Sequence, residues 1–91
     1  MDPRTILSAE KFVHIYDWED TPGTVYELHS HHDKVTIFVT AGDVTFSFVN
    51  GTTRQVSSGQ RFDVPPGIAH SAVVGVAGCK YIVGEMIEGD S

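Results

Sequence analysis

Two histidines stand one residue apart in the segment Tyr26-Glu27-Leu28-His29-Ser30-His31-His32. The segment is predicted to be extended, and side chains in a strand point alternately to its two faces. His29 and His31 are therefore expected on one face, as two neutral imidazoles on one rigid element. Such a pair is suited to hold a metal ion when a third ligand comes from elsewhere, and His70 is the candidate.

The same alternation predicts a carboxylate beside the histidines. Glu27 is expected on the face of His29 and His31. Because two residues along a strand span about 7 Å, a role in orienting His29 is favoured over direct ligation for Glu27. Glu85 is a further candidate if Tyr81 and Glu85 face inward. Whether a carboxylate completes the site stays open.

Glycine and proline interrupt the chain at short intervals and leave little room for a helix of three turns. Only Thr5 to Lys11 has helical character, with Ser8 as a possible cap. Tight turns are predicted at Gly42-Asp43, Asn50-Gly51 and Ala77-Gly78. Short strands are predicted at residues 12–18, 24–31, 35–41, 44–49, 52–56, 60–64, 68–76 and 79–87. This spacing favours an all-β sandwich or barrel.

Length and charge restrict the class of protein. Ninety-one residues predict a single domain over residues 1–91. Six Lys and Arg against twelve Asp and Glu give a net charge of −6, which argues against a nucleic-acid partner. The apolar runs are too short for a membrane span, and no signal peptide opens the sequence, so a cytoplasmic location is expected.

Two motifs in this sequence resemble those of the cupin family. The first, over residues 29–42, has the family's spacing His-x-His, three residues, Glu, six residues, Gly, with Val35 in place of the Glu. The second, over residues 59–70, matches Gly, five residues, Pro-x-Gly, two residues, His, and ends at His70. Together, in this order and at this spacing, the motifs are a specific signal.

The resemblance implies a small jelly roll, the double-stranded β-helix of two antiparallel sheets. It also implies that His29, His31 and His70 are the metal-binding histidines, without the usual Glu because Val35 stands there. The ion would be divalent Fe, Mn, Ni, Cu or Zn, and the sequence does not choose among them. Small single-domain microbial cupins similar to this chain are commonly homodimers.

A three-His site without a carboxylate resembles that of the cupin thiol and β-diketone dioxygenases. The first hypothesis is therefore a small metal-binding cupin. If it is an enzyme, the favoured reaction is a metal-dependent dioxygenation or a related conversion of a small chelating substrate. The alternative is a non-catalytic binding or sensor cupin. An apolar lining is expected, since the inward positions are aliphatic or aromatic: Val35, Ile37, Val39, Phe46, Phe48, Ala72 and Val74.

Overall fold

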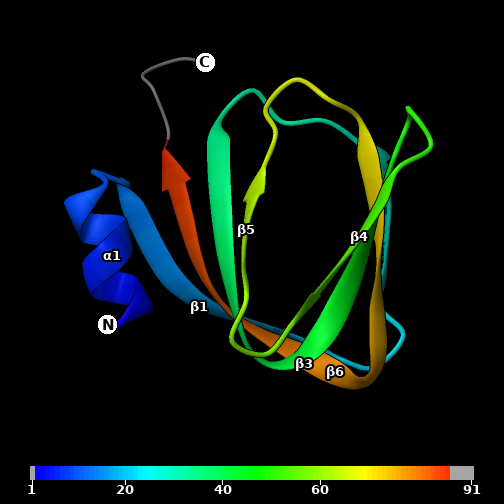
Figure 1. Ribbon diagram of the computed structural model, residues 1–91, viewed down its shortest axis with the longest axis horizontal. Helices are drawn as coiled ribbons and strands as arrows, with labels where there is room; N and C mark the ends of the chain where they lie inside the picture. The colour runs from blue at the N-terminus through cyan, green and yellow to red at the C-terminus, as the bar shows by residue number, and fades with distance from the viewer. Residues whose placement is uncertain (1, 87–91) are drawn as a thin grey trace.

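A computed structural model describes residues 2–86 as a barrel of antiparallel strands with one short helix at its side (Figure 1). The elements are α1 (Pro3–Ala9), β1 (His14–Asp20), β2 (Val25–His29), β3 (Lys34–Phe48), β4 (Thr53–Ser57), β5 (Arg61–Val64) and β6 (His70–Met86). The predicted all-β jelly roll is confirmed. Ile87, in the last predicted strand, lies outside the described residues.

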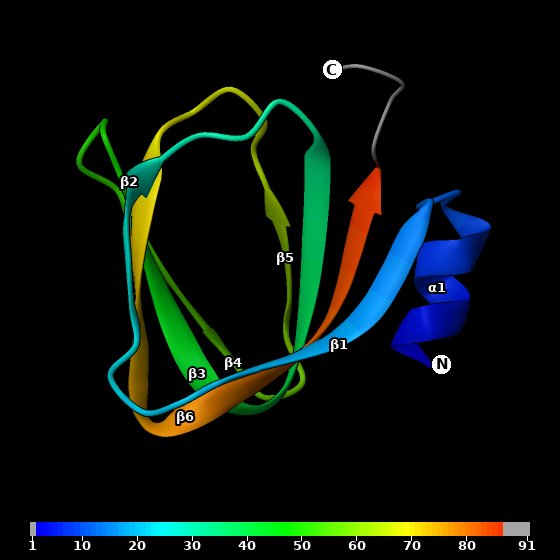
Figure 2. The ribbon, with the colours of Figure 1, turned by 180° about the vertical axis from the view of Figure 1, so that it is seen from behind.

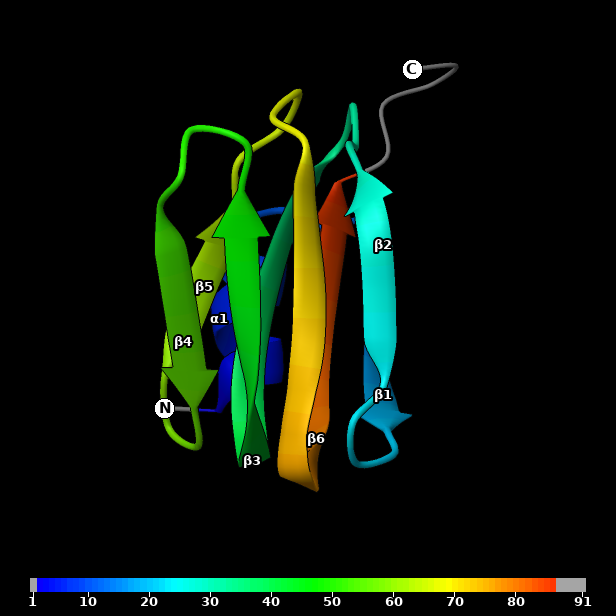
Figure 3. The same ribbon diagram turned by 90° about the vertical axis from the view of Figure 1, so that its right-hand side faces the viewer.

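The barrel consists of two sheets that share its two long strands. In one sheet, β1 pairs with the second half of β6, which pairs with the first half of β3, and β5 adds to β3. In the other, β2 pairs with the first half of β6, which pairs with the second half of β3, and β4 adds to β3. Figure 3 shows β2, β6, β3 and β4 side by side in this second sheet. Figure 2 shows β1 running from beside α1 along β6 to the lower end of the barrel.

The two long strands bend where the sequence predicted turns. The predicted turns at Gly42-Asp43 and Ala77-Gly78 are wrong, because β3 and β6 continue through them and remain paired, with register shifts between Val39 and Val44. Gly42 and Gly78 have φ values of 75° and 76°, which favour glycine, and a Cβ on Gly42 would overlap the carbonyl oxygen of Gly78. Each long strand thus runs down one wall and up the other, so that its two ends reach the same end of the barrel (Figure 1).

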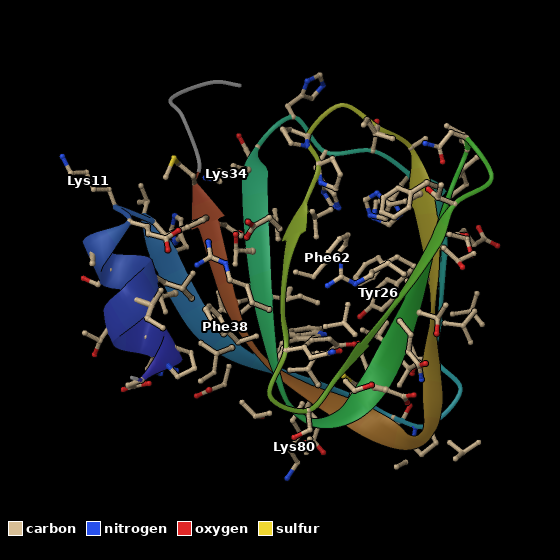
Figure 4. The ribbon with its side chains drawn as sticks, in the orientation of Figure 1. Lys11, Tyr26, Lys34, Phe38, Phe62 and Lys80 are labelled. Carbon is tan, nitrogen blue, oxygen red and sulfur yellow. The ribbon has the colours of Figure 1, made fainter. Side chains whose placement is uncertain are left out.

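The core fills the space between the two sheets. Its buried members come from three strands, β3, β4 and β6: Ile37, Val39, Val44, Phe46, Val56, Ala72, Val74, Cys79, Tyr81 and Val83. Partly buried aromatic residues pack against them, and the side chains of Tyr26 and Phe62 point into the barrel in Figure 4. The apolar alternation in the sequence therefore gave the inward faces of β3 and of the first half of β6 correctly.

Helix α1 packs on the outside of the first sheet. It begins two residues earlier than the sequence predicted, since the carboxylate of Asp2 accepts a hydrogen bond from the backbone N–H of Arg4 and Pro3 occupies the first turn. Ser8, the predicted cap, lies inside the helix. Leu7 is fully buried. A Cβ on Gly84 would lie so close to the side chains of Leu7 and Phe12 that these would have to move.

Candidate metal centre

Three histidines from two segments of the chain meet inside one end of the barrel. His29 ends β2, His31 lies in the following loop, and His70 begins β6, where it pairs directly with His29. One ring nitrogen from each lies within 4.8 Å of the other two. The structure therefore brings together all three residues that the sequence predicted as ligands.

Backbone carbonyls orient two of the rings. The carbonyl oxygen of Glu27 lies 2.6 Å from His29 Nδ1, and that of Ile68 lies 3.2 Å from His70 Nδ1. A carbonyl oxygen only accepts, so each Nδ1 carries the proton and donates it. The Nε2 atoms of His29 and His70 then keep a free lone pair, which is the state that a metal-binding imidazole requires.

The spacing of the nitrogens fits a metal ion. His29 Nε2 lies 3.1 Å from His31 Nε2. Two imidazoles that bind one ion at about 2.1 Å, at a right angle, place their nitrogens about 3.0 Å apart. Without an ion, His31 can donate an Nε2 proton to His29 across this distance, and an ion would take the place of that proton. The donor set is thus three neutral nitrogens, a set that suits Fe(II), Mn(II), Ni(II), Cu(II) and Zn(II).

The surroundings of His31 favour its neutral form. Burial lowers the pKa of His31 below its ordinary value, and the neighbouring His29 and His70 lower it further. The negative charges of Glu85 and Asp33 act in the opposite direction and only partly offset this. Because a metal ion binds the neutral imidazole, the site is prepared for an ion at neutral pH.

Glu27 does not face the histidines as predicted. A β-bulge between Tyr26 and His29 inserts one extra residue into β2, since these two residues pair with Ala72 and His70. The bulge changes the alternation, so Tyr26 points into the barrel and the side chain of Glu27 is exposed. Glu27 contributes to the site through its backbone carbonyl, which orients His29.

Glu85 does face into the barrel. Its carboxylate lines the same cavity as the three histidines, and Tyr16 donates a hydrogen bond of 2.6 Å to Glu85 Oε2. Glu85 lies opposite Val35 in the pairing of β6 with β3. It is outside the close group formed by the three histidine nitrogens.

The histidines open into a cavity of about 270 Å³ in the barrel. Four of the predicted lining residues contact it: Val35, Ile37, Phe46 and Ala72. The other three do not line it. Val39 and Val74 lie deeper in the core, and Phe48 packs beside the ring of His70 with the centroids 5.7 Å apart.

The cavity is more polar than the sequence predicted, because β1 contributes Trp18 and Asp20 to it. Asp20 is only 8% exposed, and three donors surround its carboxylate. Tyr26 O–H and Trp18 Nε1–H donate to Oδ1 at 2.7 and 3.1 Å, and Tyr81 O–H donates to Oδ2 at 2.9 Å. Burial, and then the bond to Asp20, raises the pKa of Tyr26, so this hydroxyl stays protonated. Alternation along β1 puts Trp18 and Asp20 on one face, but the other two donors, Tyr26 and Tyr81, come from different strands, so the sequence pattern alone did not reveal this polar group.

The comparisons with known proteins agree with this architecture. The sequence model described as Cupin domain matches residues 16–84. This chain belongs to the cupin family. In this cupin, the match includes all three histidines, the whole of β3, and β6 as far as Gly84. No curated protein matches the sequence. Within residues 2–86, no helix is long and apolar enough to cross a membrane.

Solved structures with the same fold include proteins of several kinds. The DMSP lyase DddQ from Ruegeria pomeroyi superimposes with a TM-score of 0.71 at 19% identity, over 85% of this chain and 39% of that one. Protein NMB1881 from Neisseria meningitidis superimposes with a TM-score of 0.70 at 18% identity, over 96% of this chain and 98% of that one. Oxalate decarboxylase of Bacillus subtilis, described with Mn(II) centres, superimposes with a TM-score of 0.70 at 21% identity, over 85% of this chain and 22% of that one. This cupin thus spans well under half the length of the lyase and the decarboxylase, and at these identities the likeness shows the fold alone.

Proposed function

We propose that this cupin is a metal-dependent enzyme that binds one divalent ion through His29, His31 and His70 and acts on a small molecule that chelates that ion. The observation that supports this proposal is the convergence of three imidazole nitrogens within 4.8 Å at the edge of a cavity. Three ligands from one side leave coordination positions free for a substrate.

The surrounding residues would fix how a substrate lies. Val35, Ile37 and Phe46 offer apolar contacts beside the histidines. Farther along the cavity, the hydroxyls of Tyr26 and Tyr81 are fixed by Asp20. A cavity of about 270 Å³ admits only a small molecule, with a chelating end at the histidines and a mainly apolar remainder.

When bound, the ion would supply Lewis-acid activation of the chelating group and, if it is iron, redox chemistry with O₂. The protein's own contribution is to hold the imidazoles in one tautomer through the carbonyls of Glu27 and Ile68. The cavity walls exclude water from the apolar part of the substrate. Dioxygenation of the chelating substrate is the reaction that we propose. The expected homodimer and cytoplasmic location stay predictions.

A pair of small ketones tests this function. Protein loaded with Co(II) is titrated with acetylacetone, which chelates through two oxygens, and with 2-pentanone, which has one. We expect acetylacetone to change the visible Co(II) spectrum and 2-pentanone to leave it unchanged. Fe(II)-loaded protein should then consume O₂ in the presence of a chelating substrate. An unchanged spectrum with both ketones would contradict chelation at this site, and binding of every chelator tried without O₂ uptake would favour the sensor alternative.

A further inference from the structure

The motif that supplies two of the histidines lacks its usual carboxylate, because Val35 occupies that position. The side chain of Val35 faces the cavity, so the wall at that point is apolar. Three neutral imidazoles would leave the ion with its whole charge at the edge of a partly apolar space. A nearby carboxylate would offset this charge.

Strand pairing places a different carboxylate next to position 35, where the motif lacks its Glu. Glu85 on β6 is the direct partner of Val35 on β3 in an antiparallel pair. Directly opposed residues point to the same face, with Cβ atoms about 5 Å apart. Both residues line the cavity that the histidines face. Glu85 therefore enters the cavity from the strand next to the one where the motif would place its Glu.

The course of β6 explains how Glu85 and His70 come to line the same cavity, although they lie fifteen positions apart in the sequence. β6 begins at His70, bends at Gly78 and returns, so both of its ends lie at the same end of the barrel (Figure 1). The negative charge of Glu85 also acts on His31. It favours a higher pKa for His31, although the larger effect of burial keeps that pKa below its ordinary value.

Tyr16 holds this carboxylate in place. Its hydroxyl donates to Glu85 Oε2 at 2.6 Å, and burial, followed by this bond, raises the pKa of Tyr16 well above its ordinary value. The tyrosine thus stays a donor at neutral pH. Since one oxygen of Glu85 is bonded to Tyr16, the other is available to accept a hydrogen bond from a molecule in the cavity.

We infer that Glu85 replaces the missing motif glutamate as the positioning and charge-balancing carboxylate of the metal centre, and that Tyr16 fixes its orientation. This inference rests on the proposed three-His site. Glu85 acts on groups in the cavity from outside the histidine group, because its oxygens are not among the atoms that converge within 4.8 Å. Loss of such a partner typically weakens metal binding by about 10- to 100-fold.

Metal affinity of three variants tests the inference. The dissociation constant for Zn(II) is measured by competition with a chelating dye, and the Co(II) spectrum reports the geometry of the site. We expect Glu85→Gln to raise the dissociation constant by about 10- to 100-fold and to alter the Co(II) spectrum. Glu19→Gln is the matched control, because it removes the same charge from an exposed side chain on β1 that does not line the cavity. It should change the constant by less than about twofold.

Returning the carboxylate to β3 is the decisive variant. Val35→Glu combined with Glu85→Gln should recover most of the lost affinity, because positions 35 and 85 share one face of the paired strands. Failure of the double variant to recover affinity would overturn the inference, and so would a Glu85→Gln protein that binds Zn(II) as tightly as the Glu19→Gln control. A parent protein that binds no metal would instead refute the proposed function. Thermal unfolding of each metal-free variant separates these outcomes from loss of the fold.

Discussion

His29 Nε2 and His31 Nε2 lie 3.1 Å apart across the open end of the barrel, although both residues come from the same short stretch of chain. The carbonyl of Glu27 fixes the ring of His29, so its free nitrogen is directed at the partner ring. Two unprotonated nitrogens this close repel each other unless a proton or a cation lies between them. The short distance between these two nitrogens is therefore central to the proposed metal centre.

Acid should destabilise the metal-free protein through His31. Its pKa is lowered in the folded state, mainly by burial and then by His29 and His70, while in the unfolded chain it has its ordinary value of 6.5. The contribution of His31 to the free energy of unfolding is therefore complete above pH 6.5. It is lost as the pH falls from there toward the folded-state pKa, because the unfolded chain takes up the proton first. Urea unfolding between about pH 7.5 and 5 should show this decrease. A His31→Gln variant should show a flatter dependence, and an identical slope would contradict the assignment.

The bend in β3 should tolerate only glycine at position 42. In Gly42→Ala, the bend requires the alanine to adopt a φ near 75° and places its Cβ against the carbonyl of Gly78. We therefore expect a loss of at least about 3 kcal/mol in the free energy of unfolding. Gly51→Ala is the control, because Gly51 has φ of 90° but open space around its Cβ position. It should cost about 1 kcal/mol. Equal losses in urea unfolding would show that the contact with Gly78 is unimportant.

The carboxylate of Asp20 should be important for stability. Asp20→Ala leaves the hydroxyls of Tyr26 and Tyr81 without their acceptor in a buried place, and we expect a loss of about 3 kcal/mol. Asp17→Ala, on the same strand, removes an exposed ion pair with Arg4 and should cost less than about 1 kcal/mol. Comparable unfolding free energies for the two variants would refute the role given to Asp20.

The sequence predicted the ligand set better than its surroundings. Motif spacing identified His29, His31 and His70 because each motif specifies a strand end and a turn that are largely local. The direction of Glu27 was wrong because a bulge changes the alternation of β2, and nothing in the residues themselves marks the extra position. Glu85 was predicted only conditionally, since its direction depends on the register of a strand that continues through Gly78.

Long-range pairing accounts for the rest of the fold that was missed. Alternation found the inward residues of the strands, but Gly42 and Gly78 were interpreted as turns, because a glycine that bends a paired strand and one that ends it look the same in sequence. The polar group around Asp20 joins residues up to sixty-one positions apart, so local pattern could not assemble it. It became visible only when β1 was placed against β6.

The metal content of protein made without a histidine tag tests the central claim most directly. After incubation with Fe(II) or Zn(II) and removal of free ions, elemental analysis should find about one ion per chain. His31→Ala and His70→Ala should each lose it, while His32→Ala, which changes an exposed neighbour outside the group, should retain it. An unmodified protein that holds no ion, or a His31→Ala variant that holds as much as the parent, would contradict a three-histidine metal centre.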